Sequence, residues 1–235
     1  LLKETKGQLV SFNGGTKDNA IPRECEASLI YESDEEAAKA EELACELAET
    51  YAEELTPAEP DFSCEISCET NRTAEAIPQD AAKEFICAMR LAPNGIQKRN
   101  INMDGFVVVS LNLGVVRTEE DRIVMIFSPR SSVASLQEDT KERLNTLAET
   151  FGFTVSHSSE YPGWSFKEDS PVREICKESY KELFGEDLKI EAIHAGLECG
   201  LFSDAIKGLD AIAIGPTIAN CHTPDEYLTL DSFER

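Results

Sequence analysis

Apolar residues along the first 160 positions recur at two spacings, one typical of helices and one typical of strands. Between residues 33 and 55 they fall on every third or fourth position, which predicts an amphipathic helix. Its apolar stripe consists of Ala37, Ala40, Leu43, Ala44, Leu47 and Tyr51. Ser33 or Asp34 can cap this helix, because short polar side chains accept hydrogen bonds from the first turn. The same spacing predicts helices over residues 77–92 and 132–152.

Strand patterns lie between these helices. Residues 7–33 read as strand, turn and strand, with a turn rich in glycine, aspartate and asparagine. Residues 106–132 hold two apolar runs joined by a short acidic turn, which predicts a hairpin. Apolar and polar residues alternate over 61–70, which predicts a half-buried strand, and residues 153–161 are expected to close the sheet as a further strand. Residues 92–105 are expected to form a loop.

The pattern changes at the Pro-Gly-Trp stretch, residues 162–164. Before it, the alternation of strands and helices predicts an α+β unit over residues 1–162, with an antiparallel sheet and helices on one face. Each half of this unit carries strands and helices, which would fit a structural duplication. We therefore place a domain boundary here and assign residues 163–235 to a second segment.

The second segment has the pattern of α/β structure. A helix is predicted over residues 170–185, and a shorter one over 197–206. Uninterrupted apolar runs flank the shorter helix at 187–196 and 209–215. Such runs are typical of parallel strands that are buried on both faces.

Charge and composition restrict the classes of partner. The chain carries 45 acidic and 22 basic residues, a net charge of −23, which disfavours nucleic acids and anionic membrane surfaces. The sequence contains no run of about 18 apolar residues, the length that a membrane-spanning helix needs. The eight cysteines include no C-x-x-C pair, and the first residues lack the pattern of a secretory signal. We therefore expect a cytoplasmic protein with reduced cysteines.

The three histidines are the first candidates for chemistry. His194 and His222 both follow predicted parallel strands, at the edge where open α/β sheets place their sites, whereas His157 is expected at the surface. From the residues alone, His222 is a metal ligand, a general base or an ordinary polar loop residue. The sequence has no H-x-D, H-E-x-x-H or C-x-x-C, so it does not assemble a complete zinc site. Glycines on either side of Glu198 would let backbone N–H groups approach a ligand closely.

A thiol enzyme is a further alternative, with Cys221 beside His222 or Cys199 beside Glu198. Neighbouring residues on a loop rarely present both side chains to one substrate, so this alternative is disfavoured.

Three stretches resemble one family of enzymes. The stretch "AIHAGLECGLFSDAIKGLDAIAIGPTIANCHTPDEYLTL" closely resembles the C-terminal part of cytosolic aminoacyl-histidine dipeptidases. These belong to the carnosinase and carboxypeptidase G2 superfamily of two-zinc metallopeptidases. "LVSFNGGTKDNAIPRECEA" resembles the lid domain of that family, and "IFSPRSS" resembles its lid strand that ends in a substrate-binding arginine. The resemblance implies that residues 1–162 form most of a lid, and that 163–235 form the C-terminal part of the catalytic α/β domain.

The resemblance also implies roles for single residues. His222 matches the last zinc ligand of the family, whose complete enzymes bind two zinc ions. Asn19 and Arg130 match lid residues that hold the substrate carboxylate or the developing oxyanion, so we expect both to be at least partly exposed. The "HAGLECG" stretch matches the cradle for the substrate backbone, which makes its members candidates for substrate binding: His194, Gly196 and Glu198.

The remaining family motifs are absent from the sequence. The His-x-Asp ligand motif, the bridging Asp, the general-base Glu and the lid His have no counterpart here, so the resemblance assigns no catalytic residue to this chain. We therefore expect a part of a dipeptidase that is inactive alone. The alternative is a lid-type binding or dimerisation module without catalysis, in which an exposed sheet edge pairs with a second copy to form a homodimer.

Overall fold

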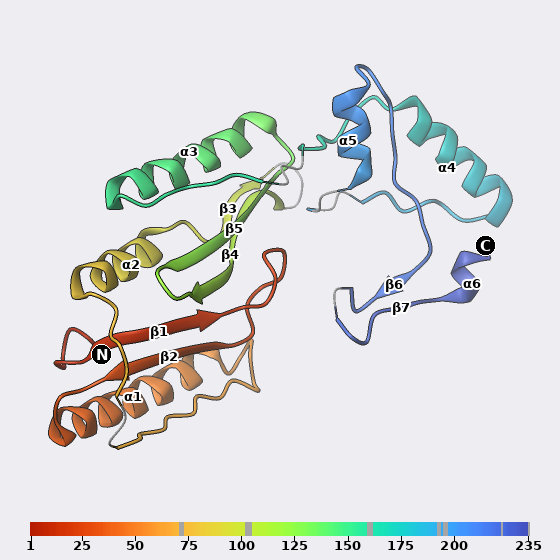
Figure 1. Cartoon of the computed structure of the whole chain (residues 1–235). Coiled ribbons are helices and arrows are strands. Elements are labelled where there is room, and N and C mark those ends of the chain that lie inside the picture. Colours follow the sequence, from red (N-terminus) through yellow and green to blue (C-terminus); the bar gives the residue numbers. More distant parts are fainter. Residues whose placement is uncertain are drawn as a thin grey trace. The chain divides into compact units, whose positions relative to one another are not determined.

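The structure is a computed structural model that describes residues 1–70, 73–101, 105–158, 162–191, 194, 197–221 and 223–234. Its main sheet has five strands (Figure 1): β1 (Gln8–Gly14), β2 (Cys25–Ile30), β3 (Gly95–Asn100), β4 (Phe106–Thr118) and β5 (Ile123–Ser131). The helices of the described residues are α1 (Asp34–Leu55), α2 (Gln79–Leu91), α3 (Ala134–Phe151), α4 (Pro171–Phe184), α5 (Glu198–Ala205) and α6 (Leu230–Phe233). A second small sheet pairs β6 (Ile218–Ala219) with β7 (Tyr227–Leu228).

The main sheet is built around β4. This strand pairs antiparallel with β3 along its first half and with β1 near its end, and it also pairs with β5. β1 and β2 form an antiparallel hairpin in which Gln8 lies opposite Ile30 and Gly14 opposite Cys25. The predicted antiparallel α+β class is therefore confirmed, whereas the placement of all helices on one face and the duplication stay predictions.

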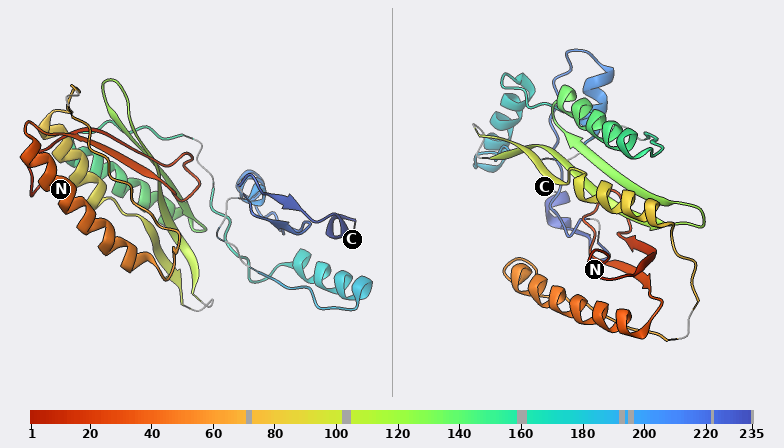
Figure 2. Two further views of the ribbon diagram at one scale, coloured as in Figure 1. Left: turned by 90° about the horizontal axis from the view of Figure 1, so that it is seen from below. Right: turned by 90° about the vertical axis from the view of Figure 1, so that its left-hand side faces the viewer.

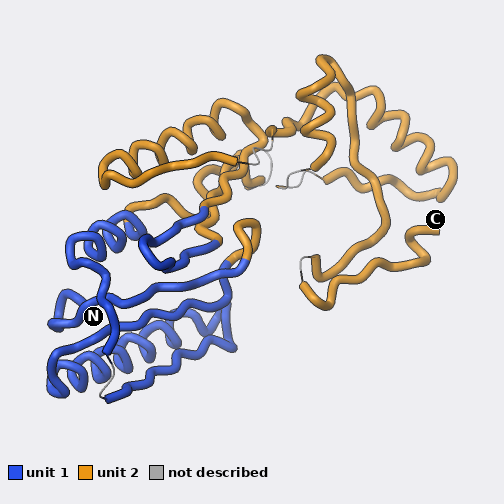
Figure 3. Tube along the Cα trace, viewed as in Figure 1, with its two compact units in different colours: residues 1–16, 22–90, 115–126 blue, residues 17–21, 91–114, 127–235 orange. Residues whose placement is uncertain are grey.

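The chain divides into two compact units (Figure 3). The first comprises residues 1–16, 22–90 and 115–126, and the second comprises 17–21, 91–114 and 127–235. The sequence boundary at residue 162 lies inside the second unit and stays a prediction.

In the first unit, α1 and α2 lie beside the β1–β2 hairpin. Phe12 of β1 meets Phe85 of α2 edge to face, with ring centroids 5.5 Å apart. The α1 helix runs alongside the hairpin in all three views (Figures 1 and 2), and its Glu36 carboxylate accepts a hydrogen bond from the backbone N–H of Lys6 at 3.0 Å. The Ser33 hydroxyl caps this helix, as predicted, by accepting from the Glu36 N–H at 3.3 Å.

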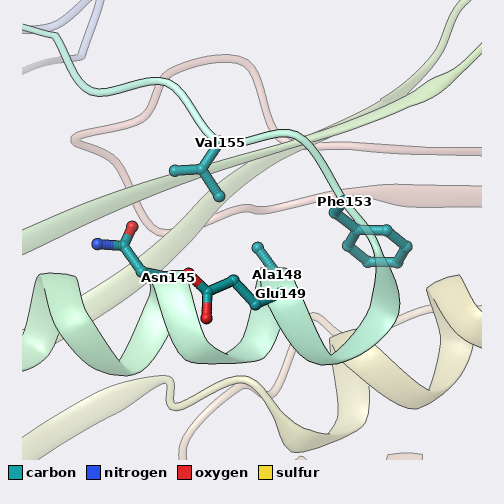
Figure 4. Close-up of a pocket in the computed structure, with 5 residues that line it drawn as sticks. All are labelled: Asn145, Ala148, Glu149, Phe153 and Val155. Carbon is teal, nitrogen blue, oxygen red and sulfur yellow. The ribbon is translucent and has the colours of Figure 1, made fainter.

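The second unit contains β3, the first part of β4, most of β5, and α3. Gly152 ends α3 in the left-handed conformation with φ of 68°, which glycine adopts without strain. After it, residues 153–158 do not form the predicted closing strand, and this prediction is wrong. The segment instead turns back along α3, where Phe153 and Val155 lie over Ala148 (Figure 4). His157 is exposed, as expected, and its Nε2 lies 2.9 Å from Asn145 Oδ1 of the same helix.

Two further predictions are wrong, one of a strand where the structure has none and one of a loop where the structure has a strand. Residues 61–70 form no strand and are almost entirely exposed, because an alternating segment without a partner strand buries nothing. Residues 92–105, predicted as a loop, contain β3, whose side chains are mostly polar and whose backbone pairs with β4.

The predicted parallel strands are also wrong for the residues that the structure describes. Residues 187–191 and 209–215 form no strand, and Ile190 and Ile214 are 41% and 77% exposed. A buried parallel strand needs hydrogen-bonded neighbours on both sides, and neither segment has one among the described residues. The predicted helices are confirmed as α4, capped by the Ser170 hydroxyl, and α5. Within the described part of the chain, no helix is long and apolar enough to cross a membrane.

Leu111 of β4 offers a direct test of the fold. Its side chain is 1% exposed, and we expect Leu111→Ala to lower the free energy of unfolding by about 2–5 kcal/mol, because the substitution leaves a cavity. Urea unfolding followed by circular dichroism measures this loss. Ile101→Ala is the matched control, since Ile101 is 89% exposed. Equal losses for the two variants would contradict the placement of Leu111 in the core.

Candidate functional site

The candidate site is organised by one face of β4 in the second unit. Side chains two residues apart on a strand point to the same side, so Ser110, Asn112 and Gly114 share a face, while Val109 and Leu111 on the opposite face are buried. Two segments that are distant in sequence contact the polar face. One is the segment around His194, and the other is the turn that carries Asn19.

His194 contacts the first half of β4. Its Nε2 lies 2.7 Å from Ser110 Oγ, and its ring meets the Phe106 ring edge to face with centroids 6.5 Å apart. Burial lowers the pKa of His194 below its ordinary value, and the nearby charge of Arg130 lowers this pKa further. A hydrogen bond to the backbone of Val107 acts in the opposite direction. Burial and the charge of Arg130 therefore both favour the neutral imidazole.

Arg130 is the next-to-last residue of β5 and is half-buried. Its charge is the second cause, after burial, that lowers the pKa of His194. Asn19 is exposed in the turn at residues 17–21. The expected exposure of Asn19 and Arg130 is thus confirmed, whereas their roles stay predictions.

The Pro-Gly-Trp stretch and Ser165, which follows it, pack against the end of β5, and Pro162 also packs against α5. A Cβ on Gly163 would lie 2.7 Å from the Ser131 carbonyl oxygen, so only glycine permits this close approach. The Ser165 hydroxyl donates to the Ser132 carbonyl at 2.6 Å. A Cβ on the buried Gly200 of α5 would lie 2.8 Å from the Pro162 carbonyl oxygen. The first turn of α5 carries Glu198, which is exposed.

Two of the predicted residues lie outside the described residues, namely Gly196 and His222. In the part of the chain that the structure describes, no group of three or more His, Cys, Asp or Glu residues could hold a metal ion. A zinc site needs three or four protein ligands. The described residues therefore do not fit a complete zinc centre.

Sequence reasoning missed the residues that hold the site together, Ser110 and Asn112. A signal for them was present, because they are the only polar side chains in the apolar run "FVVVSLNLGVV". A strand buried on one face tolerates such residues on its other face, where they can hold neighbouring segments.

The effect of the Arg130 charge on the pKa of His194 can be tested by titration. Removing the positive charge in Arg130→Gln takes away one cause of the lowered pKa, so we expect the His194 pKa to rise while remaining below its ordinary value because burial persists. NMR titration of the imidazole measures this shift. Arg143→Gln on the exposed face of α3 is the control and should leave the titration unchanged. An unchanged His194 pKa in Arg130→Gln would show that the charge of Arg130 does not act on His194.

Comparisons with known proteins agree on one family. The sequence matches the profile described as peptidase family M20/M25/M40 over residues 15–235. It is 33% identical over 229 residues to the cytosol non-specific dipeptidase of Escherichia coli strain K12, and the match covers 96% of this chain and 46% of that protein. The crystal structure of aminoacylhistidine dipeptidase from Vibrio alginolyticus matches with a TM-score of 0.81 and 33% identity, covering 99% of this chain and 47% of that one.

The chain thus spans about half the length of these relatives. The resemblance seen in the sequence motifs is confirmed, and it extends over almost the whole chain. The chain belongs to the peptidase family M20/M25/M40.

Proposed function

We propose that this chain is part of a cytosolic metallopeptidase that hydrolyses dipeptides such as Xaa-His. The observation that carries this proposal is the match of almost the entire chain to two dipeptidases, each at 33% identity. In this proposal residues 1–162 act as a lid and residues 163–235 complete the catalytic domain.

The chain's own contribution is to bind and orient the substrate. Arg130 holds the free carboxylate of the dipeptide, because the planar guanidinium can donate two parallel hydrogen bonds to it. Burial and the charge of Arg130 both lower the pKa of His194, which favours the neutral imidazole, so Arg130 supplies the positive charge for the carboxylate. Asn19 donates to the carboxylate or to the developing oxyanion. His194, Gly196 and Glu198 line the cradle for the substrate backbone.

The proposed cofactor is zinc, with two ions in the complete enzyme and His222 as one ligand. Bound zinc polarises a scissile carbonyl and activates water. The described residues do not assemble such a centre. In this proposal the other ligands and the general base would come from the rest of the complete enzyme. The chain alone is then inactive.

The proposed partners are the dipeptide and a second copy of the protein. A net charge of −23 favours neither nucleic acids nor anionic membranes. A homodimer would be compatible with the proposed role of the chain in substrate binding. Light scattering over a range of protein concentrations tests whether the dimer forms. A mass that stays at that of one protomer would exclude the dimer.

The function is tested on the complete protein that contains this chain. We expect hydrolysis of Xaa-His and other dipeptides, little hydrolysis of the corresponding tripeptides and dipeptide amides, loss of activity with a chelator and recovery with zinc. The free carboxylate explains this preference, since Arg130 holds it at a fixed distance from the reacting bond. Activity that is indifferent to the chelator, or equal on dipeptides and their amides, would contradict the proposal.

A further inference from the structure

The turn at residues 17–21 is attached to β4 by one side chain. Asn112 donates a hydrogen bond from Nδ2 to the Asp18 carbonyl and another to the Ala20 carbonyl, each at 2.8 Å. These two carbonyls lie on either side of Asn19 in the chain. Figure 3 shows the consequence for the fold, since residues 17–21 group with the second unit although residues 1–16 and 22–90 group with the first.

The chemistry of this contact requires an amide at position 112. The side-chain nitrogen of asparagine carries two N–H donors, so one short and rigid side chain can hold two carbonyls at once. An aspartate of the same shape would present only acceptors to the two carbonyl oxygens. The contact fixes the backbone around Asn19 and leaves the side chain of Asn19 exposed.

Gly114 of β4 is the second residue that the turn packs against. A Cβ at this position would lie 2.5 Å from the Asp18 carbonyl oxygen and 2.6 Å from the Asp18 Cα, closer than any side chain allows. Gly114 is buried and is not among the glycines with positive φ, so the glycine is needed for space and not for its backbone conformation. Every larger residue would push the turn away from β4.

We propose that Asn112 is a positioning residue of the enzyme, which holds the turn on β4 so that Asn19 meets the substrate. Asn112 contacts the turn and not the substrate, and it acts through Asn19. This inference rests on the proposed function, in which Asn19 donates to the carboxylate or oxyanion of a dipeptide. The ordering of the turn by Asn112 does not depend on that function and can be measured without it.

The first experiment measures order in the turn of the 235-residue chain. In the unmodified chain we expect NMR order parameters of about 0.8 at residues 18–20, falling below about 0.6 in Asn112→Asp. Asn94→Ala is the control, because the Asn94 side chain also bonds to β4, accepting from the Leu113 N–H at 2.8 Å, and this hydrogen bond does not involve the turn. Circular dichroism verifies that each variant is folded. An ordered turn in folded Asn112→Asp would overturn the proposal.

The second experiment measures kinetics in the complete protein. We expect Asn112→Asp to lower kcat/KM for a dipeptide about 10- to 100-fold, as small misplacements of a binding group do, and Asn94→Ala to leave it unchanged. A double-mutant cycle with Asn19→Ala tests whether the effect of Asn112→Asp depends on Asn19. If Asn112 acts through Asn19, Asn112→Asp costs little more once Asn19→Ala is present.

The outcomes separate the two claims. A loosened turn in a complete protein that hydrolyses no dipeptide would refute the proposed function and leave the structural role of Asn112. Dipeptidase activity with Asn112→Asp and Asn19→Ala losses that simply add would refute the positioning role and leave the proposed function.

Discussion

The 235-residue chain by itself will hydrolyse no Xaa-His dipeptide and will hold less than one zinc ion per chain after gel filtration. Tight zinc binding needs several ligands that are already in place, and activation of water also needs a general base. The described residues contain no group of three metal-ligating side chains, and His222 is a single imidazole. We therefore expect dipeptide hydrolysis by the chain alone to be below the limit of detection, in contrast to the complete enzyme.

The measurement combines two assays on the purified chain. Zinc is added, excess metal is removed, and the bound metal is counted by plasma emission while dipeptide hydrolysis is followed by the release of histidine. The complete protein serves as the positive control, and the chain carrying His222→Ala shows how much of any weak binding depends on that residue. Stoichiometric zinc together with turnover by the chain alone would show that it holds a full site.

The elements that the sequence predicts well carry their own start and stop signals. The α1 helix has a continuous apolar stripe and a serine in position to cap it, and α3 ends at a glycine that adopts the left-handed conformation. These signals are local, so they do not depend on what the helix packs against. The β4–β5 pair is similar, because two apolar runs are joined by a short turn.

The strand predictions failed where pairing decides the structure. β3 has the sequence "GIQKRN", which lacks an apolar face, yet its backbone pairs with β4 from Gly95 to Asn100. Residues 61–70 have the alternation of a strand but no partner in the described residues, and they stay irregular. Strand formation depends on hydrogen bonds to a distant segment, and the side-chain pattern does not specify that segment.

The same limit applies to the site. The predicted residues came from motifs, but the contacts that hold them connect β4 to positions far along the chain, with Asn112 and Asp18 separated by 94 residues and Ser110 and His194 by 84. Spacing along the sequence contains no information on such pairs. What the sequence does show is that two polar side chains interrupt an apolar strand, and this marks the place where the partners attach.

In the complete protein, Arg130→Ala will raise KM for dipeptides about 10- to 150-fold and leave kcat nearly unchanged. A charge-assisted, bidentate hydrogen bond to a carboxylate contributes roughly 1.5–3 kcal/mol, which corresponds to this range. The free carboxylate keeps its charge throughout the reaction, so Arg130 binds the substrate and the transition state equally. Loss of such uniform binding raises KM without lowering kcat.

Two controls isolate the carboxylate contact. Arg143→Ala removes an exposed guanidinium of α3 and should leave the kinetics unchanged. A dipeptide amide lacks the carboxylate, so it should be a poor substrate for the unmodified enzyme and lose little more with Arg130→Ala. The variant Arg130→Lys should fall between, because lysine keeps the charge but cannot donate two parallel hydrogen bonds. A fall in kcat at constant KM would indicate that Arg130 contacts the oxyanion and not the carboxylate, since only a contact made in the transition state has that effect. Unchanged kinetics would remove Arg130 from the site.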